Sequence, residues 1–173
     1  MIGHCQFATD VDLIYFDFAK AFDSVFHPKL VHKLQAYRFS GDLLHILCDF
    51  LCDCLQRVVL PNGFSTLCPV TSGVPQGSVL GPVIFLIYIN DIVDLFENSG
   101  VCTKLYADDI KIYLEITNDS DYEMLQDHIN QIYVWSNLWQ LRLANDKCQH
   151  NHITLSTTAR LVDYSVRYAI ADH

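Results

Sequence analysis

The hydrophobic residues of this chain recur with two periods, one typical of strands and one typical of helices. Residues 11–17 form a short apolar run rich in strand-forming residues, which predicts a largely buried strand ending at Asp17. Apolar residues then recur at helical spacing from Pro28 to a break at Ser40. A second apolar helix is predicted over residues 43–55.

Turn-forming residues divide the middle of the chain. Pro61–Gly63 separates two strand-like runs, and Asn and Gly tolerate the positive φ of a tight turn, so a hairpin is predicted over residues 56–70. Residues 72–77 contain two glycines and a proline and are expected to be irregular. Ser78 is expected to cap a helix that is buried over residues 79–89 and runs to about Asp94.

The last part of the chain alternates as a hairpin and then becomes helical. Its arms lie near residues 101–106 and 110–116, with Asp108 and Asp109 at the turn. A long helix is expected after Ser120, which would cap it, and one apolar face of this helix recurs every three or four residues. That face comprises Leu125, Ile129, Ile132, Trp135 and Trp139. Short strands are expected in the last thirty residues, and the whole order predicts an α+β fold with an antiparallel sheet.

Composition and charge narrow the possible domain organisation, binding partners and compartment of the chain. With 173 residues and 51% hydrophobic content, the chain has material for one packed domain. Its net charge of -9 and eleven basic residues contrast with the clustered Lys and Arg of nucleic-acid binding proteins, so a basic surface is expected elsewhere. Seven cysteines without a secretory signal favour a reducing, intracellular compartment.

The cysteines themselves are given structural interpretations. Cys48, Cys52 and Cys54 lie in an apolar stretch and are expected to be buried as small hydrophobic residues. The spacing of Cys148, His150 and His152 matches no standard zinc finger, so zinc is not expected there.

Two adjacent carboxylates at a hairpin turn are the strongest chemical signal. Asp residues are common in turns because they bond to the local backbone, so Asp108 and Asp109 also have a purely structural explanation. Asp17 ends an apolar strand and would approach them if the two strands are sheet neighbours. Nucleotidyl transfer requires two divalent ions about 4 Å apart. Such ions prefer hard carboxylate oxygens.

Four blocks in order strengthen the chemical interpretation. They are Asp17–His27, Ser72–Pro82 with Tyr88–Asp91 after it, Tyr106–Asp109, and a block from Trp135 to Cys148. Over residues 10–155 the chain therefore resembles the reverse transcriptases of non-LTR (LINE-type) retrotransposons.

The resemblance implies a polymerase palm over residues 1–155, with a small antiparallel, ferredoxin- or RRM-like sheet backed by helices. Residues 42–72 would be a remnant of the fingers, which are otherwise truncated, and no thumb is expected. Residues 156–173 would form short C-terminal strands at the start of the palm–thumb junction. The implied partners are an RNA template, a DNA primer, deoxynucleoside triphosphates and the missing fingers and thumb of the parent protein. No membrane is expected, and the parent element would act in the nucleus or cytoplasm.

The resemblance also implies roles for the metal-binding residues. Asp17 and Asp108 would ligate two Mg²⁺ ions, for which Mn²⁺ could substitute. Asp109 would be the third carboxylate, and the carbonyl of Phe18 an extra ligand. Lys147 would protonate the pyrophosphate leaving group or offset its charge, although a solvated surface lysine is the open alternative.

Four further residues would contact the nucleotides. Phe22 would be a steric gate against a ribose 2′ hydroxyl, with a plain core aromatic as the alternative. Gln76 and Gly77 would lie beside the incoming nucleotide and the template. Tyr106 would lie near the primer end, or simply pack on its strand. The histidines, including His27, are expected to be structural or surface residues, and the two tryptophans are expected to lie in the core.

The fourth block departs from the family. Ala144 replaces a usual asparagine, and residues 149–152 are polar where an apolar strand is expected. These departures weaken the assignments of Lys147 and of the local strand. A catalytically inactive, truncated retrotransposon remnant is therefore the alternative function. An RNA-dependent RNA polymerase is opposed by Phe22, and a group II intron reverse transcriptase is a close competitor.

Overall fold

A computed structural model describes residues 10–154 and Tyr164, which belong to two compact units. The first unit combines residues 10–18, 92–138 and 143–154 with Tyr164, and the second combines Ala19–Asp91 with Trp139–Arg142. Helices and small antiparallel sheets are both present, as the sequence predicts. The strands expected over residues 156–173 lie outside the described residues.

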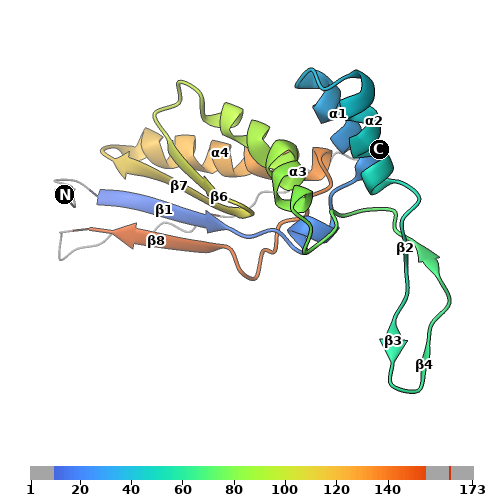
Figure 1. The fold of residues 1–173 in the computed structure, drawn as a ribbon. Coiled ribbons are helices and arrows are strands. Elements are labelled where there is room, and N and C mark those ends of the chain that lie inside the picture. The colour runs from blue at the N-terminus through green and yellow to red at the C-terminus, as the bar shows by residue number, and fades with distance from the viewer. Residues whose placement is uncertain (1–9, 155–163, 165–173) are drawn as a thin grey trace, which may run out of the picture. The chain divides into compact units, whose positions relative to one another are not determined.

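The first unit is built on a four-stranded sheet. Its strands are β1 (Asp10–Phe16), β6 (Cys102–Tyr106), β7 (Asp109–Ile116) and β8 (Gln149–Ile153). They lie in the order β6-β7-β1-β8, and every neighbouring pair is antiparallel (Figure 1). The predicted strand before Asp17 and the predicted hairpin around Asp108 are therefore confirmed.

One long helix, α4 (Asp119–Leu138), packs along this sheet against β7 (Figure 1). Its buried apolar side chains are spaced by three or four residues, which is the stripe that the sequence predicts. They are Leu125, Ile129, Ile132 and Trp135. Trp139 lies beyond the end of α4, in the second unit, and is only half-buried.

The predicted cap of α4 is wrong. The Ser120 backbone N–H donates to Oδ1 of Asn118 at 2.9 Å, so Asn118 and not Ser120 accepts the first free donors of the helix. Asp121 Oδ2 accepts hydrogen bonds from the backbone N–H groups of Thr117 at 2.7 Å and Asn118 at 2.9 Å. The side chains of Asn118 and Asp121 thus form one polar turn at the start of α4. The hydrogen bonds from Thr117 and Asn118 to the Asp121 carboxylate lower the pKa of Asp121.

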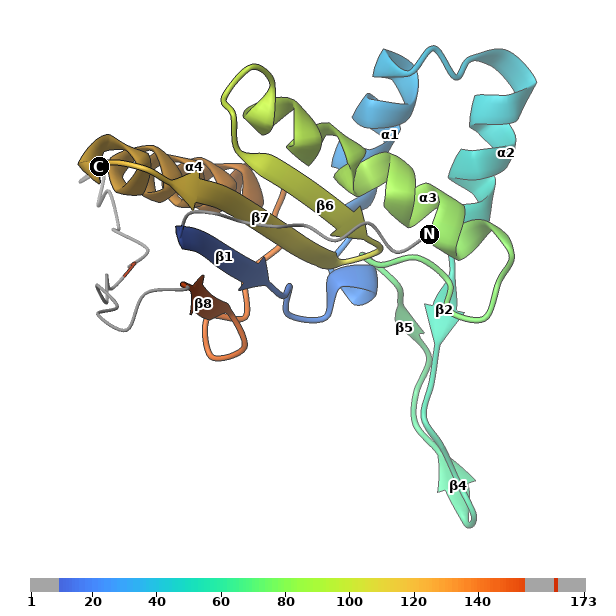
Figure 2. The ribbon, with the colours of Figure 1, turned by 90° about the vertical axis from the view of Figure 1, so that its left-hand side faces the viewer.

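The second unit contains helices α1 (His27–Ala36), α2 (Gly41–Leu51) and α3 (Leu80–Ile89), with α1 in contact with both of the others (Figure 2). A buried lysine, Lys33 of α1, ties this unit together. Its Nζ donates to Asp91 Oδ1 at 2.6 Å and to the carbonyl of Tyr88, and it lies 3.6 Å from the ring centroid of Trp139.

A long hairpin connects α2 to the segment before α3 (Figure 2). Its strands are β2 (Leu55–Gln56), β3 (Val59–Leu60), β4 (Gly63–Phe64) and β5 (Cys68–Pro69), paired β2 with β5 and β3 with β4. This confirms the predicted hairpin, but neither Asn62 nor Gly63 adopts the positive φ that was expected. Many of its apolar side chains are exposed, namely Leu55, Val58, Val59, Leu60, Phe64 and Leu67.

Two helix boundaries and several burial predictions need correction. α2 ends at Leu51 rather than at residue 55, because Asp53 adopts a φ of 56° that no α-helix continues. Cys52 is consequently exposed, and Cys48 and Cys54 are only half-buried.

The helix expected to run to Asp94 is α3 followed by a 3₁₀ segment, η2 (Asn90–Phe96). Its expected burial is wrong at Val79, which is 90% exposed, and at the exposed residues Val83 and Leu86. The six described cysteines are free thiols. No helix in the described part of the chain has the length and apolarity needed to cross a membrane.

Candidate functional site

In the first unit, the end of β1 lies beside the β6–β7 turn. Phe16 pairs with Ile110 and Tyr106 pairs with Asp109, so Asp17 comes level with Asp109 in the antiparallel register. Facing Cα atoms in such a ladder are about 4.5–5.5 Å apart. The structure therefore brings Asp17 level with the turn that carries Asp108 and Asp109, although the sequence separates Asp17 from that turn by some ninety residues.

The β6–β7 turn has a strained backbone. Ala107 and Asp108 form its two central residues, and Ala107 adopts a φ of 52°. A left-handed conformation costs an L-residue roughly 1–2 kcal/mol, which the paired strands on either side must offset. Asp108 is half-buried in this turn and Asp109 is exposed.

Lys147 lies against these carboxylates. Its Nζ is 3.1 Å from Asp17 Oδ2, although 61% of the lysine side chain is exposed. The hydrogen bond and charge of Asp17 raise the pKa of Lys147, and the charges of Asp146 and Asp108 raise it further. The lysine is therefore a member of the acidic cluster rather than an isolated surface residue.

Backbone hydrogen bonds hold the segment that carries Lys147. The Ala144 N–H donates to the Asp17 carbonyl, and the Lys147 N–H donates to the Ala144 carbonyl, both at 2.8 Å. Phe18 forms an isolated antiparallel bridge with Leu143, and its ring is buried 6.2 Å from that of Trp135. Because the backbone of residue 144 makes these contacts, the alanine found there does not prevent them.

The donor set suits a hard divalent cation. Carboxylate oxygens are the ligands that such cations prefer, and Asp17, Asp108 and Asp109 carry them at one sheet end, with Lys147 beside Asp17. Among the residues that the structure describes, no three His, Cys, Asp or Glu side chains are already arranged to hold a metal ion.

In the second unit, Phe22, Gln76 and Gly77 line one cavity of about 240 Å³. The Phe22 ring is half-buried and stacks on Phe85 with centroids 4.2 Å apart. Gln76 is exposed, and its Nε2 donates to Asp23 Oδ1 at 2.7 Å. Gly77 has a φ of 79°, which explains the need for glycine at this position.

Three further predicted residues have clear surroundings. Tyr106 is 83% exposed, so simple packing on its strand does not explain it. His27 is buried, and its Nε2 donates to the carbonyl of Gly73 at 2.7 Å. Trp135 is buried as predicted.

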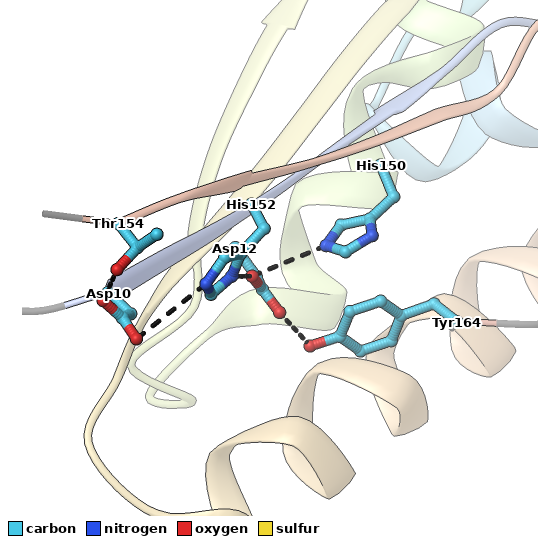
Figure 3. A network of polar contacts seen from close by, with 6 residues as sticks. All are labelled: Asp10, Asp12, His150, His152, Thr154 and Tyr164. Atoms are coloured by element: carbon cyan, nitrogen blue, oxygen red, sulfur yellow. Dashed lines mark hydrogen bonds and ion pairs between the residues drawn. The ribbon is translucent and has the colours of Figure 1, made fainter. Parts of the chain in front are cut away.

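The first unit also contains a buried polar network that the sequence patterns do not predict (Figure 3). The Asp12 side chain is fully buried in β1, and its carboxylate accepts hydrogen bonds from His152 Nδ1 and the Tyr164 hydroxyl, both at 2.5 Å. His150 Nε2 lies 3.5 Å from the same carboxylate. Burial and the hydrogen bond to Asp12 raise the pKa of Tyr164.

This network explains why β8 is polar. His152 lies directly opposite Asp12 in the register, so a histidine on β8 pairs with a carboxylate on β1. An apolar strand could not satisfy that carboxylate. Neighbouring Cys148 has a thiol whose pKa is raised, mainly by burial.

Comparisons with known proteins agree with the sequence motifs. The model of the family described as "Reverse transcriptase (RNA-dependent DNA polymerase)" matches residues 8–168. The RNA-directed DNA polymerase from mobile element jockey of Drosophila melanogaster is 29% identical over 140 residues, which are 78% of this chain and 15% of the relative. A probable RNA-directed DNA polymerase from transposon BS of the same species is 27% identical over 150 residues, 83% of this chain and 16% of the relative. The chain thus spans about one sixth of these relatives' length.

Solved structures share the fold. Telomerase from Candida tropicalis in complex with a fragment of telomeric RNA superposes with a TM-score of 0.69 at 12% identity, covering 92% of this chain and 28% of that one. Telomerase from Candida albicans, also with a telomeric RNA fragment, gives a TM-score of 0.65 at 14% identity, covering 89% and 28%.

Proposed function

Because the chain belongs to the reverse transcriptase (RNA-dependent DNA polymerase) family, we propose that it is the palm region of an RNA-directed DNA polymerase. It would add deoxynucleotides to a DNA primer on an RNA template. Residues 42–72 would belong to the fingers, and the thumb would lie in other parts of the parent protein. Two observations support this proposal: the relatives from jockey and transposon BS are named as RNA-directed DNA polymerases, and the telomerase with the same fold is in complex with an RNA fragment.

One observation carries the proposal: the end of β1 lies level with the β6–β7 turn. Asp17, Asp108 and Asp109 would hold two Mg²⁺ ions there, with the Phe18 carbonyl as an extra ligand, and Mn²⁺ could substitute. The ions, when bound, would activate the primer hydroxyl and stabilise the leaving pyrophosphate. Lys147 would hold a proton at Nζ for the leaving group, and its raised pKa keeps it charged.

Residues of the second unit would act on the nucleotides. Phe22 would exclude a ribose 2′ hydroxyl, since its ring is held by stacking on Phe85 and cannot turn away without losing that contact. Gln76 and Gly77 would contact the incoming nucleotide and template from the loop before α3. In the first unit, Tyr106, with its exposed ring, would pack near the primer end.

Primer extension by the isolated chain on an RNA template with Mg²⁺ tests this function. We expect extension by the wild type and a loss of about 10²- to 10³-fold with Asp108→Asn, because removal of a metal ligand removes charge stabilisation in the transition state. Asp94→Asn, an exposed carboxylate in η2, is the matched control and should retain activity. Equal rates for the wild type and Asp108→Asn would contradict the assignment.

A second candidate function is a catalytically inactive remnant. One observation favours it: the side chains in the described part of the chain form no ready metal site. Thermal melting with and without Mg²⁺ separates the candidates, since a ligand that binds only the folded state raises its stability. A rise with the wild type, absent in Asp108→Asn, supports the polymerase. No rise together with no extension supports the remnant.

A further inference from the structure

Two loops of the second unit are joined by a set of backbone hydrogen bonds. The Val74 N–H donates to the Phe22 carbonyl at 2.9 Å, and the Gly73 N–H donates to the Val25 carbonyl at 2.8 Å. Phe26 and Ser72 form an antiparallel bridge beside them. The loop before α3 is therefore fixed in register against the segment that contains η1 (Ala21–Asp23).

Gly73 sets how closely the loops approach. A Cβ at this position would lie 2.9 Å from Asp23 Cα and 3.0 Å from the Asp23 carbonyl oxygen, and the residue has a φ of 89°. Glycine therefore allows a separation that no other residue would, and this separation lets the side chains of Asp23 and Gln76 meet.

The contact between these side chains fixes the orientation of an amide. Gln76 Nε2 lies 2.7 Å from Asp23 Oδ1. An ionised carboxylate only accepts hydrogen bonds, so the NH₂ end of Gln76 has to face Asp23. The carbonyl oxygen Oε1 is on the other side of the same planar amide and is left as an acceptor.

The pair stands between two cavities. Asp23 and Gln76 both line a cavity of about 560 Å³, and Gln76 also lines the cavity of about 240 Å³ that contains Phe22. The lining of the larger cavity also includes Lys20 and His27. A turn of the Gln76 amide would therefore change the hydrogen-bonding character of a surface shared by both cavities.

We infer that Asp23 is a positioning residue: it orients the Gln76 amide so that Oε1 is presented to a hydrogen-bond donor of the incoming deoxynucleotide. This inference rests on the proposed function. Asp23 itself need not touch the nucleotide.

The contact is tested first without any activity, by NMR of the glutamine side-chain amides. The Gln76 signal is assigned from its disappearance in Gln76→Ala. In the wild type one of its two amide protons should be shifted downfield by the carboxylate, and Asp23→Ala should return it to the position of an unpaired glutamine. Asp49→Ala, an exposed carboxylate in α2, is the control and should leave the signal unchanged.

The positioning role is tested by primer extension with the same variants. Asp23→Ala should raise KM for deoxynucleotides about 5- to 10-fold with kcat changed less than about 2-fold, the loss expected from one net hydrogen bond. Asp23→Asn should give an intermediate rise, because an asparagine can pair with either end of the amide. Asp23→Ala combined with Gln76→Ala should be no worse than Gln76→Ala alone.

Each outcome decides the inference. An unchanged Gln76 signal in Asp23→Ala, an unchanged KM, or multiplicative losses in the double variant would overturn it. If the wild type does not extend primers, Mg²⁺–deoxynucleotide is titrated onto the Gln76 signal instead. A shift present in the wild type and lost in Asp23→Ala supports positioning although the proposed activity fails, whereas no shift overturns both.

Discussion

Replacing Lys33 by methionine should destabilise the second unit strongly. Methionine fills nearly the same volume as the lysine stem, so packing is kept while the charge and its hydrogen bonds are removed. The lysine is 3% exposed and donates hydrogen bonds to two oxygen atoms, one on the Asp91 side chain and one on the Tyr88 backbone. Both acceptors lose this donor in the variant.

The magnitude follows from the burial of the partners. Removing one partner of a buried ion pair costs about 3–5 kcal/mol. The Asp91 side chain is 28% exposed, so water relieves part of its charge and we expect the lower end, about 3 kcal/mol. The cation over the Trp139 ring, with its centroid 3.6 Å away, adds to the loss. Against a typical total of about 5–15 kcal/mol, this change is large.

Urea unfolding followed by tryptophan fluorescence measures the effect. Trp135 and Trp139 are the two tryptophans of the chain and belong to different units, so a Trp135→Phe background isolates the second unit. Lys29→Met, one helical turn earlier, is the matched control; its Nζ lies 6.0 Å from the Phe26 ring centroid, and a loss of about 1 kcal/mol or less is expected. Adding Asp91→Asn to Lys33→Met should recover about 1–2 kcal/mol relative to the sum of the single changes. A Lys33→Met loss below about 1 kcal/mol, or an additive pair, would refute the reasoning.

Three further predictions concern other parts of the chain. Gly73→Ala should cost more than about 2 kcal/mol in urea unfolding, because of its φ and its contact with Asp23, whereas Gly63→Ala, with open space around it, should change stability little. Burial raises the pKa of Tyr88 to about 12 from about 10, so the unfolded chain ionises first. The Tyr88 contribution to stability should be full below pH 10 and fall by about 2 kcal/mol towards pH 12, and the total fall should be smaller by that amount in Tyr88→Phe. Asp12→Ala should cost about 2–4 kcal/mol in the first unit, read from Trp135, because it leaves two buried donors without an acceptor; no loss would contradict the network.

Local patterns predicted the parts of the fold in which one sequence segment determines its own structure. The apolar run before Asp17, the β6–β7 hairpin and the stripe on α4 each follow from periodicity and turn chemistry within a few residues. The prediction that Asp17 approaches Asp108 needed one further assumption, namely that the strands next to these residues are neighbours in the sheet. The pairing of β1 with β7 confirms that assumption.

Long-range polar contacts were not predictable in this way. Nothing near Asp12 in the sequence indicates that His152 and Tyr164 will meet it, because these residues are at least 140 positions away. The burial of Lys33 has the same origin, since its partner Asp91 lies 58 positions along the chain. The cap of α4 failed for a different reason: several side chains near residue 118 can cap a helix, and only the backbone geometry selects one.

The contact of Asp12 with β8 makes β1 and β8 depend on each other, although they are far apart in the sequence. A chimera that receives an apolar strand in place of residues 149–153 would keep the backbone ladder but leave a buried carboxylate without donors. The reverse exchange, with an apolar residue at position 12, would leave the His152 side chain, which is 6% exposed, without its carboxylate acceptor. Residues 10–16 and 149–153 therefore depend on each other, and a chimera that replaces one of these strands should replace both together.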